Sequence, residues 1–83
     1  MMQLITSVIS QCVVATNQQF VDSLKKAGEF TVEAQNEAFE STKNAVLDLL
    51  SPDAIEYIET EYNDVDLFLD KKIEEEVYKN KAQ

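Results

Sequence analysis

Apolar residues recur every three or four positions along most of the chain, which is the spacing of one face of an α-helix. The first such run extends from Leu4 to Ala27 and predicts a long helix over residues 3–27. No long stretch alternates apolar and polar residues as a half-buried strand does. We therefore expect an all-α fold, a small bundle of four helices with short connections and a long first helix. The four expected helices cover residues 3–27, 31–50, 52–62 and 64–80.

Local signals mark where these helices end and begin. Gly28 follows two lysines and is placed to close the first helix in the left-handed conformation. Thr31 can cap the second helix with its hydroxyl. Ser51 and Pro52 are the strongest signal, because proline has no backbone N–H to lose at the first position of a helix. Since the links are this short, we expect a single helical domain over residues 1–83.

Charge is distributed unevenly along the chain. The sequence has 7 lysines, no arginine and 16 acidic residues, a net charge of -9, and no charged side chain occurs in residues 1–21. A protein with this excess of negative charge repels phosphate groups. We therefore expect no direct binding to nucleic acid.

The residue types needed for common catalytic and metal sites are missing. The sequence has no histidine and a single cysteine, Cys12, which excludes a Ser/His/Asp or Cys/His catalytic unit and a zinc site of Cys/His type. We expect a protein that is not an enzyme and has no catalytic, cofactor-binding or metal residues, no cofactor and no small-molecule substrate. One cysteine cannot form an internal disulfide, which favours a reducing compartment such as the cytoplasm.

The acidic residues of the C-terminal half allow two further interpretations. Asp64, Asp66, Asp70 and Glu75 match positions 1, 3, 7 and 12 of a calcium-binding loop, but Leu69 stands at the sixth position, where glycine is needed. We therefore expect these acids to cap a helix instead. The second interpretation is a mimic of nucleic acid phosphates. The charges presented in that case are Glu56, Glu59, Asp64, Asp66, Asp70 and Glu74.

The first helix carries apolar side chains on more sides than a small bundle can cover. We therefore expect a homo-oligomer that assembles through this helix. The expected self-association face consists of Leu4, Val8, Ile9, Cys12, Val13, Phe20 and Leu24. In this prediction Cys12, Val13, Phe20 and Leu24 are buried against the rest of the bundle or a second copy. Leu4, Val8 and Ile9 extend that surface.

Membrane contact through the first helix is the other explanation for its lack of charge. Its most apolar part, from Leu4 to Ala15, is too short to span a bilayer, which needs about 20 mostly apolar residues. We expect a cytoplasmic protein, and a position at the inner face of the cell membrane is the alternative.

Several stretches of the sequence resemble the C-terminal soluble region of LLH-type phage holins and holin-like proteins of Gram-positive bacteria and their phages. The resemblance is one of helical pattern and turn sequence, and it covers residues 12–81. It is carried by CVVATNQQFVDSLKKAGEF (12–30), EAQNEAF (33–39), LLSPDAIEYIETEYNDVD (49–66) and IEEEVYKNK (73–81).

The resemblance implies a membrane helix followed by a cytoplasmic helical region that self-associates, in an assembly that permeabilises the membrane for lytic enzymes. Residues 1–11 cannot supply the membrane helix, so we expect either a soluble portion of such a protein or a relative without the anchor. The expected function is a non-enzymatic, self-associating phage or prophage protein with a role in host lysis. The alternative is an acidic helical interaction module, or an inhibitor that mimics nucleic acid on a protein target.

Overall fold

The computed structural model describes residues 1–82, with side chains as far as Asn80. Within this part the chain forms four helical rods and no strand. The first rod is continuous from Met2 to Ala27, and the expected all-α bundle with a long first helix is confirmed. Gln83, the last residue of the expected domain, lies outside the described residues. The elements are α1 (Met2–Thr16), η1 (Asn17–Val21), α2 (Asp22–Ala27), α3 (Val32–Leu49), α4 (Pro52–Tyr62) and α5 (Val65–Ala82).

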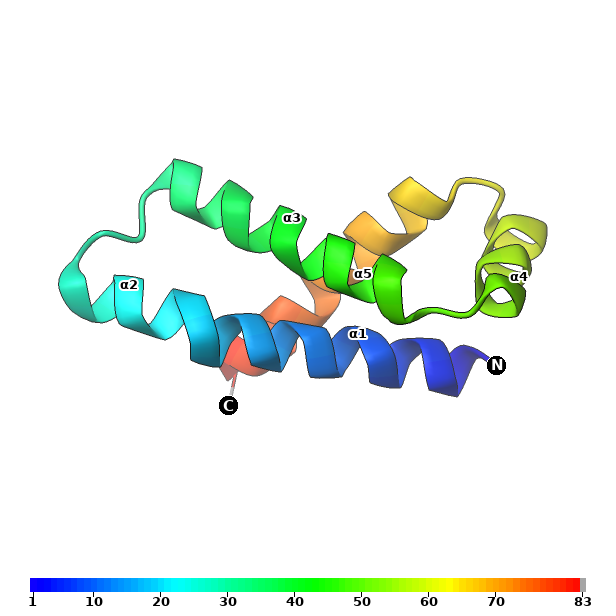
Figure 1. Cartoon of the computed structure of the whole chain (residues 1–83), viewed down its shortest axis with the longest axis horizontal. Helices are drawn as coiled ribbons and strands as arrows, with labels where there is room; N and C mark the ends of the chain where they lie inside the picture. Colours follow the sequence, from blue (N-terminus) through cyan, green and yellow to red (C-terminus); the bar gives the residue numbers. More distant parts are fainter. Residues whose placement is uncertain (83) are drawn as a thin grey trace.

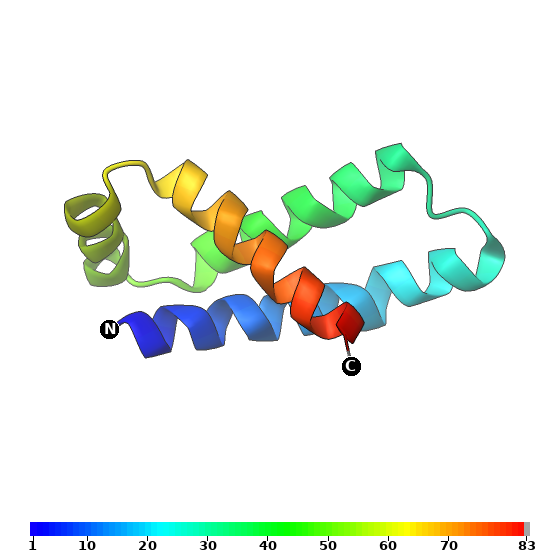
Figure 2. The same ribbon diagram turned by 180° about the vertical axis from the view of Figure 1, so that it is seen from behind.

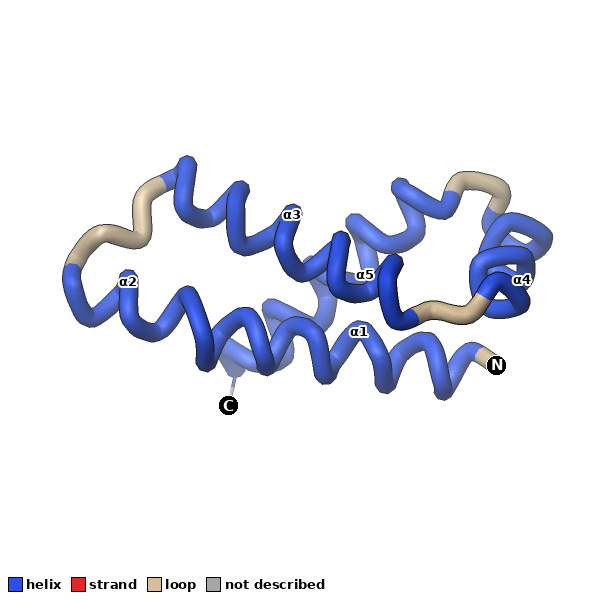
Figure 3. Tube along the Cα trace, in the orientation of Figure 1, coloured by secondary structure: helices blue, strands red, loops and turns tan. Residues whose placement is uncertain are grey.

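The helices pack in two layers. Helix α3 returns along the first rod, and α5 crosses behind both of them (Figure 1). Seen from the other side, α5 lies diagonally over α1 and α3, while short α4 stands near the N-terminus (Figure 2). Short loops join the helices (Figure 3). Because α5 covers only one side of the pair formed by α1 and α3, no helix of residues 1–82 lies over the opposite side of that pair.

The helix ends follow the local signals in the sequence. Gly28 adopts the left-handed conformation at φ 70°, and the N–H of Glu29 donates to the Leu24 carbonyl at 2.8 Å. The Thr31 hydroxyl accepts from Ala34 N at 3.2 Å, and the Ser51 hydroxyl accepts from Ala54 N at 3.1 Å. These bonds satisfy backbone donors that have no partner inside a helix. The observed helix bounds therefore differ from the expected ones by two residues at most.

The core lies where α1, α3, α4 and α5 meet. Ile5, Ile9, Ile58, Leu69 and Ile73 are fully buried there, and burying a side chain of this size contributes about 1.5–3 kcal/mol. The other buried members of this cluster are Cys12, Val13, Val46, Leu50, Ala54 and Phe68. All four rods contribute to this cluster, but the η1 and α2 part of the first rod does not.

The first rod contains one π-helical turn, η1, in which the N–H of Asp22 donates to the Asn17 carbonyl. A π turn places residues five apart on the same side of a helix. Val21 therefore lies on the buried side after Thr16 and is buried, whereas Phe20 is only half-buried. The sequence pattern assumed regular α-helical spacing and so assigned Phe20 to the packed face in place of Val21.

A pair of threonines joins the first rod to α3 just before this turn. The Thr42 hydroxyl donates to Thr16 Oγ1 at 2.8 Å, and the Thr16 hydroxyl donates to the Cys12 carbonyl at 2.9 Å. Thr42 Oγ1 is also 2.8 Å from the Ala38 carbonyl, its alternative acceptor. Because each polar atom of this partly buried pair has a partner, the threonines replace apolar side chains at this crossing without an unsatisfied group.

Candidate interaction surface

One side of the first rod is exposed and uncharged. Its residues follow each other at spacings of three and four, which keeps them on one side of the helix. We call this surface the outer stripe, and it consists of Leu4, Ser7, Gln11, Val14 and Gln18. Leu4 keeps 61% of its surface exposed, and Leu49, also 61% exposed, lies at the end of α3 that runs beside the first turns of α1 (Figure 1). The outer stripe is therefore a mixed apolar and polar surface without charge.

The structure divides the seven residues of the expected self-association face between the surface and the core. Leu4 is exposed, and Val8 is half-buried and packs against the core. Phe20 on η1 and Leu24 on α2 are half-buried. These four side chains retain surface that a second copy can contact.

Ile9, Cys12 and Val13 are buried inside the chain itself. Ile9 was expected to extend the self-association surface, but it is 0% exposed because it lies one turn after Ile5 on the side that α3 and α5 cover. In this fold these three side chains hold the bundle together and do not reach a second copy. The outer stripe supplies four exposed positions outside the expected self-association face, Ser7, Gln11, Val14 and Gln18.

Cys12 is a packing residue by its surroundings. Burial raises the pKa of its thiol above the ordinary value, so the reactive thiolate is disfavoured. Its neighbours in the core cluster are aliphatic and aromatic side chains. The thiol therefore fills space between α1 and the rest of the bundle.

The acids near the start of α5 have structural partners. Asp64 Oδ1 accepts from Leu67 N at 3.1 Å, which confirms that Asp64 caps this helix. Lys43 of α3 lies 3.0 Å from Asp70 and 3.4 Å from Asp66. These contacts, led by the hydrogen bond to Asp70, raise the pKa of Lys43 above its ordinary value. Two of the six charges expected in a phosphate mimic are thus paired with a lysine.

Glu76 lies almost buried where α5 meets the polar side of α1. Glu76 is 9% exposed, and its Oε1 lies 3.5 Å from Lys79 Nζ. A hollow beside it is lined by Gln3, Thr6, Ser7, Ser10 and other uncharged residues of α1. Ser7 and Gln11 of the outer stripe also line this hollow, so one edge of the stripe lies near Glu76.

Comparison with protein-family models, curated proteins and solved structures found no match for the chain. Every helix within residues 1–82 is too short or too polar to cross a membrane. In the same part of the chain, no three cysteine, aspartate or glutamate side chains come together in a way that can hold a metal ion. The structure thus defines a helical bundle, and its exposed surfaces are the features on which a function can be built.

Proposed function

We propose that the chain is a non-enzymatic helical interaction module that self-associates through the outer stripe of its first rod. One observation supports this above the others: the stripe is exposed and uncharged in a protein with a net charge of -9. Leu4 and Val14 provide apolar contact area there, and Ser7, Gln11 and Gln18 can form hydrogen bonds across an interface.

The distribution of charge favours this surface over all others for contact between two copies. Residues 1–36 contain three acids and two lysines, whereas residues 37–83 contain the other thirteen acids and five lysines. Two copies that meet through α4, which has four acids and no lysine, therefore bring like charges together, which costs several kcal/mol at an interface. Two copies that meet through the outer stripe avoid this repulsion.

The resemblance to holin-like proteins supports a setting for this module. In such proteins the soluble helical region joins copies of the protein, and the assembly permeabilises the membrane during host lysis. We propose that this chain performs the joining step in a phage or prophage protein of this kind, and that its first rod is the element nearest the inner face of the membrane.

The substitution Leu4→Asp tests self-association through the outer stripe. It places a charge in the uncharged surface of each copy, and we expect the dissociation constant to rise by more than about tenfold. The measurement is the mass in solution by light scattering over a range of protein concentration. Because Leu4 is 61% exposed, the substitution leaves the core intact, which circular dichroism checks.

Val32→Asp is the matched control, since Val32 is 69% exposed and begins α3 at the opposite end of the molecule. It should leave the mass unchanged. If the mass of the wild-type chain is that of a monomer at every concentration, or if both variants behave alike, the outer stripe is not the interface.

Flotation with liposomes tests the membrane setting on the same sample. We expect the chain to rise with neutral vesicles and to bind anionic vesicles less, because its net charge repels them. A chain that stays at the bottom of the gradient with both kinds of vesicle contradicts membrane contact and leaves the self-association result unaffected.

A further inference from the structure

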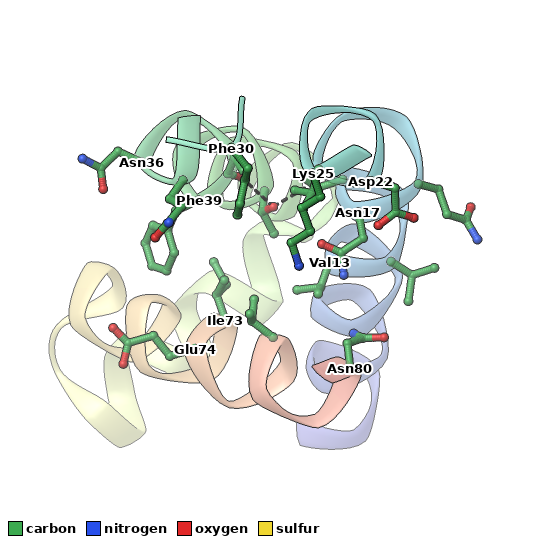
Figure 4. A pocket seen from close by; sticks show the side chains of 18 residues that line it. Val13, Asn17, Asp22, Lys25, Phe30, Asn36, Phe39, Ile73, Glu74 and Asn80 are labelled. Atoms are coloured by element: carbon green, nitrogen blue, oxygen red, sulfur yellow. Dashed lines mark hydrogen bonds between the residues drawn. The ribbon is translucent and has the colours of Figure 1, made fainter. Parts of the chain in front are cut away.

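The first rod and α3 form a helical hairpin, and a groove separates the closed end of this hairpin, around Gly28, from α5. It has a volume of about 820 Å³ and is lined by the end of α1, by η1 and α2, by the first half of α3 and by the second half of α5. Figure 4 shows Lys25 and Phe30 reaching into it from one wall and Ile73 facing it from α5. Its apolar lining consists mainly of Val13, Val21, Phe30, Phe39, Ile73 and Val77.

The groove is open because the hairpin splays at this end. Helix α2 has no buried residue, and its C-terminal cap at Gly28 turns the chain away from α5. The π turn of η1 directs Val21 into the space between the helices, where it lines the groove. Phe30 remains half-buried beside the opening, with Lys25 Nζ 5.5 Å from its ring centroid. The buried side chains of Val13, Val21 and Ile73 form the floor of the groove, and the half-buried Phe30, Phe39 and Val77 supply the apolar surface that a ligand can contact.

The rim of the groove is rich in amides and carries more acid than base. Asn17, Gln35, Asn36 and Asn80 are among its lining residues and can donate and accept hydrogen bonds. The charged lining residues are Asp22, Lys25 and Glu74, one lysine against two acids. An apolar floor with a polar, slightly acidic rim is the surface that receives the apolar side of an amphipathic helix.

The charge of the protein decides which kind of helix fits. With two acids and one lysine at the groove and a net charge of -9, the chain attracts a partner with basic residues and repels an anionic lipid headgroup. Open access to the groove suits a helix, which brings its own polar side to face water, better than a small molecule that must be enclosed. We propose that the groove binds an amphipathic helix of another protein, with an apolar side flanked by lysines or arginines. The groove shares Val14 and Gln18 with the outer stripe, but Leu4, whose substitution tests self-association, and Phe30, whose substitution tests the groove, each belong to one surface alone.

Two synthetic peptides of identical composition test this proposal. Both contain leucine, lysine and glutamine over about four helical turns. One has leucine at helical spacing, and the other has the same residues scrambled so that no apolar side forms. Titrated into the full chain at physiological salt, with binding followed by fluorescence anisotropy, the amphipathic peptide should bind at least about tenfold more tightly than the scrambled one. A third peptide with glutamate in place of lysine should not bind.

Phe30→Ser locates the binding in the groove. Phe30 lines the groove but is not among the core residues, so the fold should remain intact, and affinity for the amphipathic peptide should fall about tenfold. Tyr78→Ser is the matched control, because Tyr78 is a 75% exposed aromatic residue that does not line the groove. It should leave the affinity unchanged.

Three outcomes would overturn the proposal. Equal binding of the amphipathic and scrambled peptides would mean simple charge attraction. Unchanged affinity of Phe30→Ser would place the peptide elsewhere on the molecule. The nuclear magnetic resonance signals of Phe30 and Phe39 can also be followed without peptide. Chemical shifts that change as the protein concentration increases would mean that a second copy occupies the groove.

Discussion

Lys43 of α3 forms ion pairs with two carboxylates of α5. Its side chain is 14% exposed, and its amine lies within 3.4 Å of both Asp66 and Asp70 on successive turns of α5. The carboxylates are 77% and 41% exposed, so water screens much of the attraction. The contact therefore contributes about 1 kcal/mol or less to stability.

The raised pKa of Lys43 predicts how this contribution depends on pH. A lysine with a pKa above its ordinary value of 10.5 stabilises the folded state below that value, and the contribution disappears as pH rises through the folded pKa. Lys43→Met should therefore lower the free energy of unfolding by about 1 kcal/mol or less at neutral pH. Above the pKa of Lys43 in the folded state, the same substitution should lower the free energy of unfolding by a smaller amount. Urea denaturation of both proteins at the two pH values measures the difference.

Lys26→Met removes the same charge from α2, which is distant from both carboxylates, and serves as the control. If Lys43→Met and Lys26→Met lower the free energy of unfolding by the same amount at neutral pH, the ion pair does not contribute to stability.

At the scale of the helices, the sequence predicts where a helix begins and ends better than which of its sides is buried. Gly28, Thr31, Ser51 and Pro52 act within their own turns, so their local chemistry determines where helices stop and start. The side on which a helix packs depends on residues far away in the sequence. Phe20 and Val21 are both apolar neighbours, and only the π turn decides that Val21 is buried.

The candidate surface was foreseen only in part for the same reason. Leu4 could be picked out because it belongs to an uncharged run, but the assignment of Ile9 to the core depends on where α5 crosses α1. The groove and the contact of Lys43 with Asp70 likewise arise from the packing of α3 against α5. No local pattern of residues encodes that packing.

Deletion of Gln19 tests the structural role of the π turn. Removing one residue from η1 reduces the distance between Thr16 and Val21 to four positions, which places both on one side of a regular α-helix. We expect the variant to fold with a free energy of unfolding within about 1 kcal/mol of the wild type, since its buried side is retained. Circular dichroism during urea denaturation provides the measurement.

The control is deletion of Gln11, another exposed glutamine, from the regular part of the first rod. This deletion rotates Ile5 and Ile9 out of the core and should cost at least about 3 kcal/mol, which is enough to unfold a small domain. Similar losses for the two deletions would show that η1 is required for the fold.

At the scale of the whole molecule, the chain separates an almost neutral half from an acidic one. The described part measures 42 × 23 × 19 Å, and the outer stripe runs along the rod that extends over most of its length (Figure 1). Helix α4 carries four acids and no lysine and α3 four acids and one lysine, whereas the five acids of α5 are nearly balanced by four lysines. This separation allows two copies to approach along the first rod while their acidic helices remain apart.

The response to salt follows from this arrangement and separates the two function classes considered for the sequence. Raising the ionic strength from about 20 to 500 mM shortens the screening length from roughly 20 Å to about 4 Å, which weakens repulsion between copies of charge -9. Salt does not weaken the contact through an uncharged stripe, while it reduces the repulsion between the copies. The dissociation constant for self-association should therefore fall severalfold, as measured by sedimentation equilibrium. An acidic protein that mimics nucleic acid behaves oppositely, because its binding to a basic target weakens steeply over the same range. Self-association that weakens as salt rises would therefore mean that charged residues form the contact, and the outer stripe would lose its role as the interface.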